Sequence, residues 1–432
     1  MVEVSSSAEL MQAVRDGKTE IVLTRSVTLA SPLYLSPEVS ISAKAQEDGI
    51  LPRLIFSHSD GLILSGSSQI KDMILMTRQD KKAIQILAQQ SEEDFGKLIL
   101  ENLKINGQVS LIFRAPTLKA AVKVNDVHVI NTDTRAYLEQ PQKYGVNVLQ
   151  GAFTLYNFNP NQDSQIEASI EGLAIGLPDQ PVWGSGVFIS GFGDQGSQVH
   201  VDRLQVNDIY STGVLPQGVA DYITAGMFIS YGALVDELIH DGVTMTYGVN
   251  DMVLDAWGKV QRWIVNDKVV SYGPSGVGFV NFGQVDYFEA NASIETYGTG
   301  ARAYNQYDGY LKEGLFSDIV THNDGAVGIQ ISKKVDRLRI RGNIHTFGSL
   351  GQSLVKGVNV DLPAYAFSLK EGGALDEFIV EGDILSEGDQ VTTVIMEEGA
   401  QIGQVKVAGR VDAKGQDSQA FSSQSLAQQF EA

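Results

Sequence analysis

The chain returns to the same short pattern every 25 residues. In most copies a hydroxyl residue is followed by an aromatic residue and a glycine. The copies are TYGVND, SYGPSG, TYGTGA, THNDGA and TFGSLG, beginning at Thr246, Ser271, Thr296, Thr321 and Thr346. An apolar column shares this spacing: Val269, Ile294, Ile319 and Ile344. Self-similarity at a fixed period indicates a solenoid, in which each repeat buries its apolar face against its neighbours.

The residues between the copies favour strands over helices. Helical repeats need runs of ten or more residues with a period of 3.6, but Gly, Asn and Asp interrupt this chain too often. From Leu338 the stretch LRIRGNIHTFG alternates apolar and polar residues, as a half-buried strand does. The L-x-x-L-x-L-x-x-N pattern of leucine-rich repeats is absent. We therefore predict an all-β fold, a right-handed parallel β-helix with about 25 residues per coil and the hand set by the crossover rule.

The repeated motif is predicted to form a corner of each coil. Its Ser or Thr would point inward, and its aromatic residues would stack face to edge along the axis. Its glycine would permit a positive φ at the bend. These roles are architectural, and a binding role for the aromatic file is the alternative.

The chain divides into three predicted parts. Residues 1–36 form an N-terminal cap with a short helix in SAELMQAVRDG, and residues 37–412 form the β-helix. Insertions near 214–223 and 349–363 break the repeat and are expected to be loops, where binding residues often gather. Residues 413–432 are polar and form a tail or a C-terminal cap.

Composition narrows the function classes. The chain has no cysteine, which excludes disulfides, thiolate metal sites and Cys nucleophiles. Its net charge of −20 opposes nucleic-acid binding. No stretch approaches the ~20 apolar residues of a membrane span, and the N-terminus lacks signal-peptide features. We expect neither a nucleic acid nor a membrane as partner, and a cytoplasmic protein as the sequence is written, or a secreted one if a leader has been removed.

The opening AELMQAVRDGKTEIVLTRSVTLASPLYLSPEVSISA resembles the start of right-handed parallel β-helix proteins of the pectate-lyase-like superfamily. The string ARAYNQYDG…HNDGAVGIQISK…SLVKGV is similar to runs in bacterial β-helix proteins without an assigned activity. As an architecture, the resemblance covers nearly the whole chain. It implies a carbohydrate-active fold, which serves polysaccharide lyases, galacturonan hydrolases, uronan epimerases, phage tailspikes and adhesins.

The catalytic signatures of that superfamily are not matched. The Gly-His-Gly triplet of galacturonan hydrolases and the Asp-Pro-His-Glu string of uronan epimerases are absent. The Arg-rich and calcium-binding signatures of pectate lyases are not evident either. Whether the chain is an enzyme therefore stays open, and fold alone does not decide it.

The first candidate site is a polar column on one sheet. It contains Asp255, Asn305, Gln330 and, after the second insertion, Lys370. The column adjoins an apolar one and should face outward, with Trp257, Phe282 and Tyr307 two residues further on. Aromatic rings beside amide and carboxylate groups suit a sugar, since rings stack on its C–H face and polar groups bond its hydroxyls. The alternative is that the strand bends and buries Trp257 and Phe282.

The second candidate is a basic patch in an acidic chain. It contains Lys333, Lys334, Arg337, Arg339, Arg341, Lys356 and Lys370. Arg forks suit carboxylate or sulfate groups. We expect Arg339, Arg341, Lys356 and Lys370 to bind an acidic glycan. The alternative is a solvated face, or an interface with an acidic neighbour.

The third candidate is a catalytic group. Lyase and epimerase chemistry needs a base and a cation beside the substrate carboxylate. His322, Tyr307, Arg302 and Lys333 are expected to supply these, and a structural role for the histidine is the alternative. We expect no cofactor or metal ligand set, although scattered carboxylates leave calcium as a candidate ion.

Two functions follow from these patterns. The first is a protein that binds or modifies an acidic polysaccharide or oligosaccharide on an exposed sheet, as a lyase, epimerase, hydrolase or binder. The second is a non-catalytic structural or interaction protein, adhesin-like or self-assembling, for which a homo-oligomer is expected.

Overall fold

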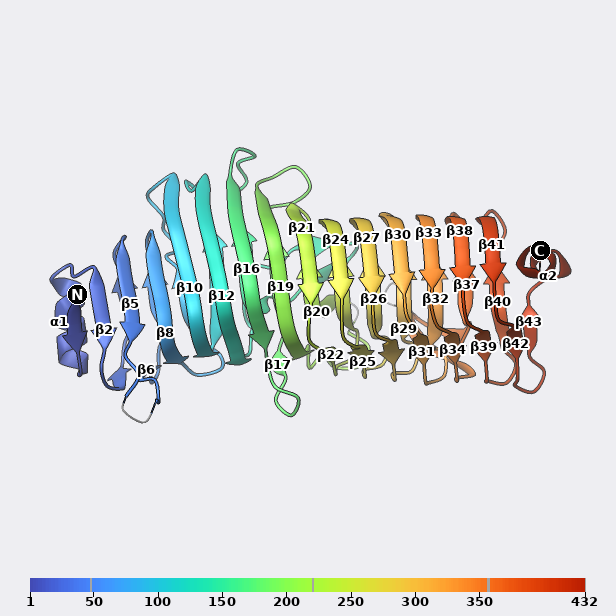
Figure 1. The fold of residues 1–432 in the computed structure, drawn as a ribbon, viewed down its shortest axis with the longest axis horizontal. Helices are drawn as coiled ribbons and strands as arrows, with labels where there is room; N and C mark the ends of the chain where they lie inside the picture. The colour runs from blue at the N-terminus through green and yellow to red at the C-terminus, as the bar shows by residue number, and fades with distance from the viewer. Residues whose placement is uncertain (47–48, 220, 356–357, 432) are drawn as a thin grey trace. The chain divides into compact units, whose positions relative to one another are not determined.

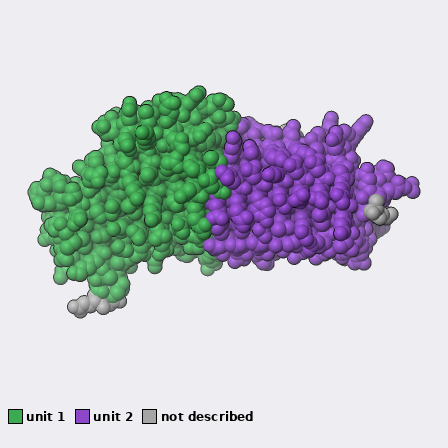
Figure 2. Space-filling view, turned by 45° about the horizontal axis from the view of Figure 1, so that its top comes forward, with its two compact units in different colours: residues 1–141, 150–210, 230–236 green, residues 142–149, 211–229, 237–432 purple. Residues whose placement is uncertain are grey.

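The computed structural model describes residues 1–46, 49–219, 221–355 and 358–431 of the chain. The chain forms two compact units, which Figure 2 colours green and purple. Unit 1 comprises residues 1–141, 150–210 and 230–236, and unit 2 comprises residues 142–149, 211–229 and 237–432. Each unit consists of parallel strands in stacked coils, so the predicted parallel β-helix is confirmed (Figure 1). None of the described helices combines the length and apolar character that a membrane crossing needs.

Helix α1 (Ser7–Arg15) lies near the start of unit 1, as predicted, and follows strand β1 (Val2–Val4). The side chain of Ser6 accepts a hydrogen bond from the Glu9 N–H at 3.3 Å, which satisfies one of the donors left open at a helix start. The buried face of α1 packs against β1 (Val2–Val4) and β3 (Val27–Leu29). The helix therefore covers the first strands, as a solenoid cap does.

The strands of unit 1 form two main parallel stacks. The first contains β1, β2 (Glu20–Leu23), β5 (Val39–Ala43), β8 (Ser68–Met76), β10 (Asp94–Asn106), β12 (Lys119–Asn131), β16 (Gln165–Ile175) and β19 (Gln198–Thr212). The second contains β4 (Leu33–Leu35), β7 (Leu62–Leu64), β9 (Lys82–Ile86), β11 (Gln108–Phe113), β15 (Gly151–Asn157) and β18 (Ser185–Ser190). Shorter strands are β3, β6 (Arg53–Phe56) and β17 (Val182–Trp183). Coil length varies from one coil to the next. Val122 pairs with Leu98, which is 24 residues before it, and with Ala168, which is 46 residues after it. This variation explains the looser sequence repeat.

Unit 2 is more regular, with three strands in each full coil. One stack, here called the cavity sheet, contains β20 (Tyr222–Ile229), β23 (Asp251–Ala256), β26 (Val277–Asn281), β29 (Arg302–Gln306), β32 (Val327–Ile331), β37 (Phe367–Leu369), β40 (Thr392–Met396) and β43 (Gln419–Phe421). The second contains β24 (Lys259–Val265), β27 (Gln284–Ala290), β30 (Tyr310–Phe316), β33 (Lys334–Ile340), β38 (Ala374–Val380) and β41 (Gln401–Val407), preceded along the chain by β21 (Ala233–His240). The third contains β22 (Thr244–Thr246), β25 (Val269–Ser271), β28 (Ile294–Thr296), β31 (Ile319–Thr321), β34 (Ile344–Thr346), β39 (Ile384–Ser386) and β42 (Val411–Ala413).

The core of unit 2 is built from residues that repeat in register. Leu254 pairs with Phe279, Phe279 with Tyr304, and Tyr304 with Ile329, and all four are fully buried. The rings of Phe279 and Tyr304 stack with centroids 5.4 Å apart. Each coil thus buries its apolar face on the next, which is the main favourable term in folding such a stack.

The repeated corner motif lies at the ends of the third stack. Its Ser and Thr residues are fully buried, as predicted. Its aromatic rings stack face to face and not face to edge, with interplanar angles of 9° for Tyr247–Tyr272, 17° for Tyr272–Tyr297, 7° for Tyr297–His322 and 2° for His322–Phe347. Parallel coils repeat one side-chain conformation at each step, so the rings remain parallel.

The glycine of the motif has a different role from the predicted one. Gly273 and Gly298 are not among the residues with positive φ; that conformation falls two residues later, at Ser275 and Gly300. A Cβ on Gly273 would lie 1.6 Å from the carbonyl oxygen of Gly248 in the preceding coil. The glycine is therefore required by the close approach of successive coils.

Two further elements complete unit 2. The second insertion forms an antiparallel pair of strands, β35 (Leu350–Val355) and β36 (Val358–Pro363). Helix α2 (Gln424–Glu431) follows β43, and its Phe430 ring lies 5.5 Å from Phe421 and 6.1 Å from Phe378. This helix covers apolar rings of the last coils, as a C-terminal cap does.

Candidate functional site

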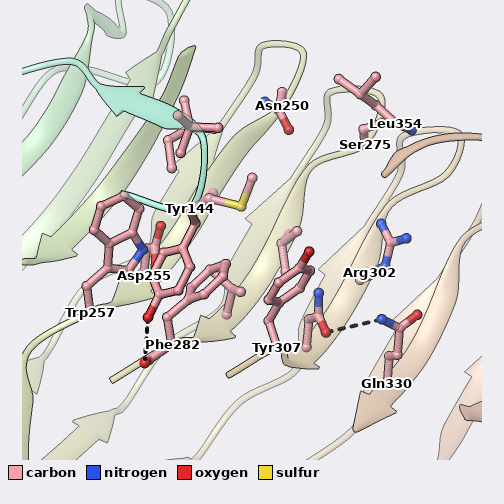
Figure 3. Close-up of a pocket in the computed structure, with 16 residues that line it drawn as sticks. Tyr144, Asn250, Asp255, Trp257, Ser275, Phe282, Arg302, Tyr307, Gln330 and Leu354 are labelled. Carbon is pink, nitrogen blue, oxygen red and sulfur yellow. Dashed lines mark hydrogen bonds between the residues drawn. The ribbon is translucent and has the colours of Figure 1, made fainter. Parts of the chain in front are cut away.

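A cavity of about 130 Å³ lies on the outer face of the cavity sheet (Figure 3). Three rows of side chains line it: two cross β23, β26 and β29 in register, and the third lies one residue beyond the ends of these strands. The rows are Met252, Val277 and Arg302; Asp255, Val280 and Asn305; and Trp257, Phe282 and Tyr307. The candidate residues Asp255, Trp257, Asn305, Tyr307, Gln330 and Arg302 are therefore brought together at one place.

A departure from strict alternation along these strands produces this arrangement. Strict alternation would place Arg302 on the inner face with Tyr304. Instead, two successive residues face the core: Phe279 is fully buried, and a Cβ on Gly278 would lie 2.4 Å from the Ile294 side chain. The extra inward residue shifts the positions before it to the outer face.

Tyr144 covers one end of the cavity. It forms, with Gly145, the turn between β13 (Gln142–Lys143) and β14 (Val146–Val148), and both turn residues have positive φ. Strand β14 pairs with β20 at the edge of the site. The Tyr144 ring lies 4.6 Å from Phe282 and 5.4 Å from Trp257. Sequence reasoning did not find this residue, although the Tyr-Gly step between short polar and apolar runs is a hairpin signal.

Trp257 faces outward but is only 4% exposed. The strand does not bend to bury it; the Tyr144 ring covers it from outside, edge to face at 86°. Phe282 and Tyr307 continue the row, with ring centroids 4.7 Å apart. The aromatic row thus forms a wall of the cavity with Tyr144 above it (Figure 3).

Asp255 is completely buried at this end of the cavity. Neither carboxyl oxygen accepts a hydrogen bond of normal geometry from the described residues. Burial raises the pKa of Asp255 well above its ordinary value, and the indole N–H of Trp257 offsets this only in part. Burial therefore favours the neutral, protonated form of this carboxyl.

Arg302 is the second charged group of the cavity and is 6% exposed. Its Nη1 donates to the Ser353 hydroxyl at 3.1 Å and to the Gly300 carbonyl at 3.3 Å, while its Nε has no acceptor among the described residues. No carboxylate of the described chain forms an ion pair with it. Burial lowers the pKa of the guanidinium to about 10, so it is charged at neutral pH without a counter-ion.

The hairpin β35–β36 supplies another wall. The Leu354 N–H donates to the Ser275 hydroxyl at 3.0 Å, and the Ser353 hydroxyl donates to the Gly300 carbonyl at 2.8 Å. Leu354 lines the cavity beside Arg302. The second insertion therefore contributes to the site, whereas the candidate Lys356 within it lies outside the described residues.

Amides line the lower side of the cavity. Gln330 donates through Nε2 to Oδ1 of Asn305 at 3.4 Å, in register across β29 and β32. The next residue in register is Ser368, not the expected Lys370. Across the insertion, paired residues are 38 positions apart in the cavity sheet but 40 positions apart in the third stack. The sequence prediction applied the spacing of 40 to both, and so it selected Lys370.

The predicted catalytic group is not assembled. His322 and Lys333 do not line the cavity that holds Arg302 and Tyr307. The His322 ring stacks on Tyr297 at 4.3 Å and on Phe347 at 5.4 Å, in the corner file. Burial lowers the pKa of His322. Its position follows from the repeat, since it replaces a tyrosine of that file.

The basic patch is neutralised by carboxylates of neighbouring coils. Arg339 donates through Nε to Glu381 at 2.7 Å, and Lys370 pairs with Glu397. Arg341 lies 3.4 Å from Glu289 and donates to Asn291 at 2.9 Å. The sequence interpretation counted charges along the chain, but the opposing charges come from the coils before and after. These residues stand apart from the cavity.

Within the described ranges, no group of three or more acidic or histidine side chains is placed to hold a metal ion. Calcium binding stays a prediction from the sequence. Neither a family model, nor a curated protein, nor a solved structure matches this chain.

Proposed function

We propose that unit 2 binds an acidic carbohydrate, with one carboxylate-bearing sugar residue in the cavity. The observation that carries the proposal is the buried, charged Arg302 without an anionic partner in the described chain. A buried cation without a partner is costly, and a ligand carboxylate that reaches the guanidinium would offset this cost through charge-assisted hydrogen bonds.

The remaining walls suit a sugar ring. The cavity of about 130 Å³ has room for roughly ten water molecules, at about 10–15 Å³ each by the same measure, which is comparable to a single sugar residue. Phe282 and Tyr307 present rings, and Asn305 and Gln330 present amides. Rings suit the C–H face of a sugar, and amides suit its hydroxyls. The sequence resemblance to the pectate-lyase-like superfamily supports carbohydrate as the ligand class.

We propose that the cavity binds the sugar, and we do not propose a reaction there. The described cavity lining contains neither His nor Lys, and burial raises the pKa of Asp255 and so favours its neutral form. A proton-abstracting base of ordinary basicity is therefore not provided by these residues.

Calorimetric titration of glucuronate and of glucose into the protein tests this proposal. We expect glucuronate to bind and glucose to bind at least tenfold more weakly. Arg302→Gln should weaken glucuronate by about tenfold to a hundredfold, the equivalent of a charge-assisted hydrogen bond of roughly 1.5–3 kcal/mol. Arg302→Lys keeps the positive charge but loses the planar guanidinium that can donate two parallel hydrogen bonds. Its affinity for glucuronate should lie between those of the wild-type protein and Arg302→Gln. Arg262→Gln on β24, whose side chain is half exposed and lies 3.7 Å from Glu237, is the control. Equal binding of both sugars would refute the proposal.

The second candidate is an interaction role for the hairpin β35–β36. Val358 is 61% exposed and Leu350 is 54% exposed, which is unusual for apolar side chains on a strand pair. Sedimentation equilibrium tests it: a dimer that dissociates in Val358→Lys supports this role, and a monomeric wild-type protein excludes self-association through the hairpin.

A further inference from the structure

Asp255 and Arg302 lie at opposite ends of the same cavity (Figure 3). Asp255 is in register with Val280 and Asn305, and Arg302 precedes Asn305 by three residues. Two strand spacings of about 4.8 Å and three residue rises of about 3.3 Å place their Cα atoms roughly 14 Å apart. The hydrogen bonds of Arg302 go to Gly300 and Ser353, and the two side chains do not form an ion pair with each other.

Each end of the cavity therefore lacks a charge of opposite sign. Among the described residues, Arg302 has no anionic partner, and the carboxyl of Asp255 has neither a cationic partner nor a hydrogen-bond donor of normal geometry. If Asp255 served only to fill space in the protein, an apolar residue of similar volume could replace it with little loss of stability. A carboxyl kept beside a cavity, with both oxygens unbonded, is suited to a group that enters from outside.

The walls around Asp255 favour a cation. The rings of Trp257 and Tyr144 lie next to it (Figure 3), and Phe282 adjoins both rings at 6.0 and 4.6 Å. Aromatic faces attract an ammonium group, and a buried carboxylate beside them adds a direct ion pair. The other titratable or charged groups near this end are the phenols of Tyr144 and Tyr307 and the ammonium of Lys143, which lies over the Tyr144 ring at 5.1 Å.

We infer that the ligand of this cavity is a zwitterion: a sugar acid with a free amino group, whose carboxylate meets Arg302 and whose ammonium meets an ionised Asp255. This inference rests on the proposed function and names the sugar class more closely, as an amino-uronic acid. On binding, Asp255 gives its proton to solvent, so two ion pairs form and the cavity has no unbalanced charge.

Four monosaccharides separate the contributions of the two charges. They are glucose, glucuronate, glucosamine and 2-amino-2-deoxyglucuronate, titrated into the wild-type protein at pH 7. We expect 2-amino-2-deoxyglucuronate to bind at least tenfold more tightly than glucuronate, and its N-acetyl derivative to lose that gain. Asp255→Asn, which matches the shape and neutrality of the protonated acid, should reduce the ratio of amino-uronate affinity to glucuronate affinity to about one. Titration in buffers of different ionisation enthalpy should show release of about one proton with the amino-uronate that is absent with glucuronate.

The outcomes are distinct. If glucuronate binds through Arg302 but the amino group brings no gain, the zwitterion inference is wrong and the proposed function stands. If the gain persists in Asp255→Asn with no proton release, Asp255 does not pair with the ammonium and the inference is also wrong. If no acidic sugar binds and Arg302→Gln has no effect, the proposed function fails. The proton count needs no variant, so it decides the matter even if Asp255→Asn does not fold.

Discussion

The rings of Tyr144 and Trp257 meet edge to face, with centroids 5.4 Å apart and planes at 86°. The two residues are far apart in the chain, and the contact closes one end of the cavity above Asp255 (Figure 3). A side chain supplied by the β13–β14 hairpin therefore helps to bury the end of the cavity where Asp255 lies.

Removing that cover should open the site. Tyr144→Ala removes two ring pairs, each worth about 0.5–1.5 kcal/mol, and exposes Trp257 and Asp255 to water. We expect acrylamide to quench tryptophan emission more strongly, and the pKa of Asp255 to fall toward its ordinary range. Tyr34→Ala, at an exposed position on β4, is the matched control. Unchanged quenching in Tyr144→Ala would mean that the hairpin does not cover Trp257.

Gly273 tests the origin of the corner repeat. Gly273→Ala places a Cβ 1.6 Å from the Gly248 carbonyl oxygen, so neighbouring coils must separate. We expect a loss of about 3 kcal/mol or more in the free energy of unfolding, measured in urea. Gly17→Ala is the control, because Gly17 has positive φ but open space around it, and should cost about 1–2 kcal/mol. If Gly273→Ala were the milder of the two, close approach of the coils would not be the reason for this glycine.

His200 should make the stability of unit 1 depend on pH. Its Nδ1 lies 2.7 Å from Glu167 and its Nε2 lies 2.9 Å from Asp236. Burial acts to lower the pKa of His200, but the hydrogen bonds to Asp236 and Glu167 outweigh it and raise the pKa. A raised pKa means that the folded state holds the proton more tightly. The stabilisation is therefore complete below the ordinary pKa of about 6.5 and is lost as pH rises through the folded-state value.

The measurement is urea denaturation of wild-type protein and His200→Gln between pH 5.5 and 9. The difference in stability between them should be largest at the acidic end and should shrink as pH rises. A difference that is constant, or that grows with pH, would contradict the assignment. Using the difference between the two proteins removes pH effects that come from other groups.

The basic patch should not contribute to sugar binding. Arg339 already pairs with Glu381, and Lys370 with Glu397. Exposed ion pairs of this kind contribute little to the free energy of folding. We expect Arg339→Gln to change glucuronate affinity by less than about twofold in the same calorimetric titration. A tenfold loss would move the binding surface from the cavity to the patch.

The fold could be predicted from the sequence because the repeat specifies it at several levels. The 25-residue period, the buried Ser/Thr column and the apolar column through Leu254 and Phe279 all follow from stacking equal coils. Each coil contacts mainly its neighbours, so local pattern and tertiary pairing agree. Unit 1 was harder to read, since its coils differ in length.

The candidate site was only partly predictable. Asp255 and Asn305 were found from their shared column and Trp257 from the aromatic row two residues further on, but Arg302 was assigned to a different group with His322. The two successive inward-facing residues, such as Gly278 and Phe279, broke the simple alternation that would have related Arg302 to Asn305. Tyr144 comes from a segment outside the repeat, and no period links it to Trp257. Charge pairing between coils 40 residues apart, as in Arg337 with Glu377, is invisible to a count along the chain.

The most direct test of the central claim is a crystal structure of the protein soaked with glucuronate at a concentration that calorimetry shows to be saturating. We expect the sugar in the cavity of unit 2, with its carboxylate within hydrogen-bonding distance of the Arg302 guanidinium and its ring against Phe282 or Tyr307. An empty cavity with the sugar bound at Arg339 or elsewhere would contradict the account.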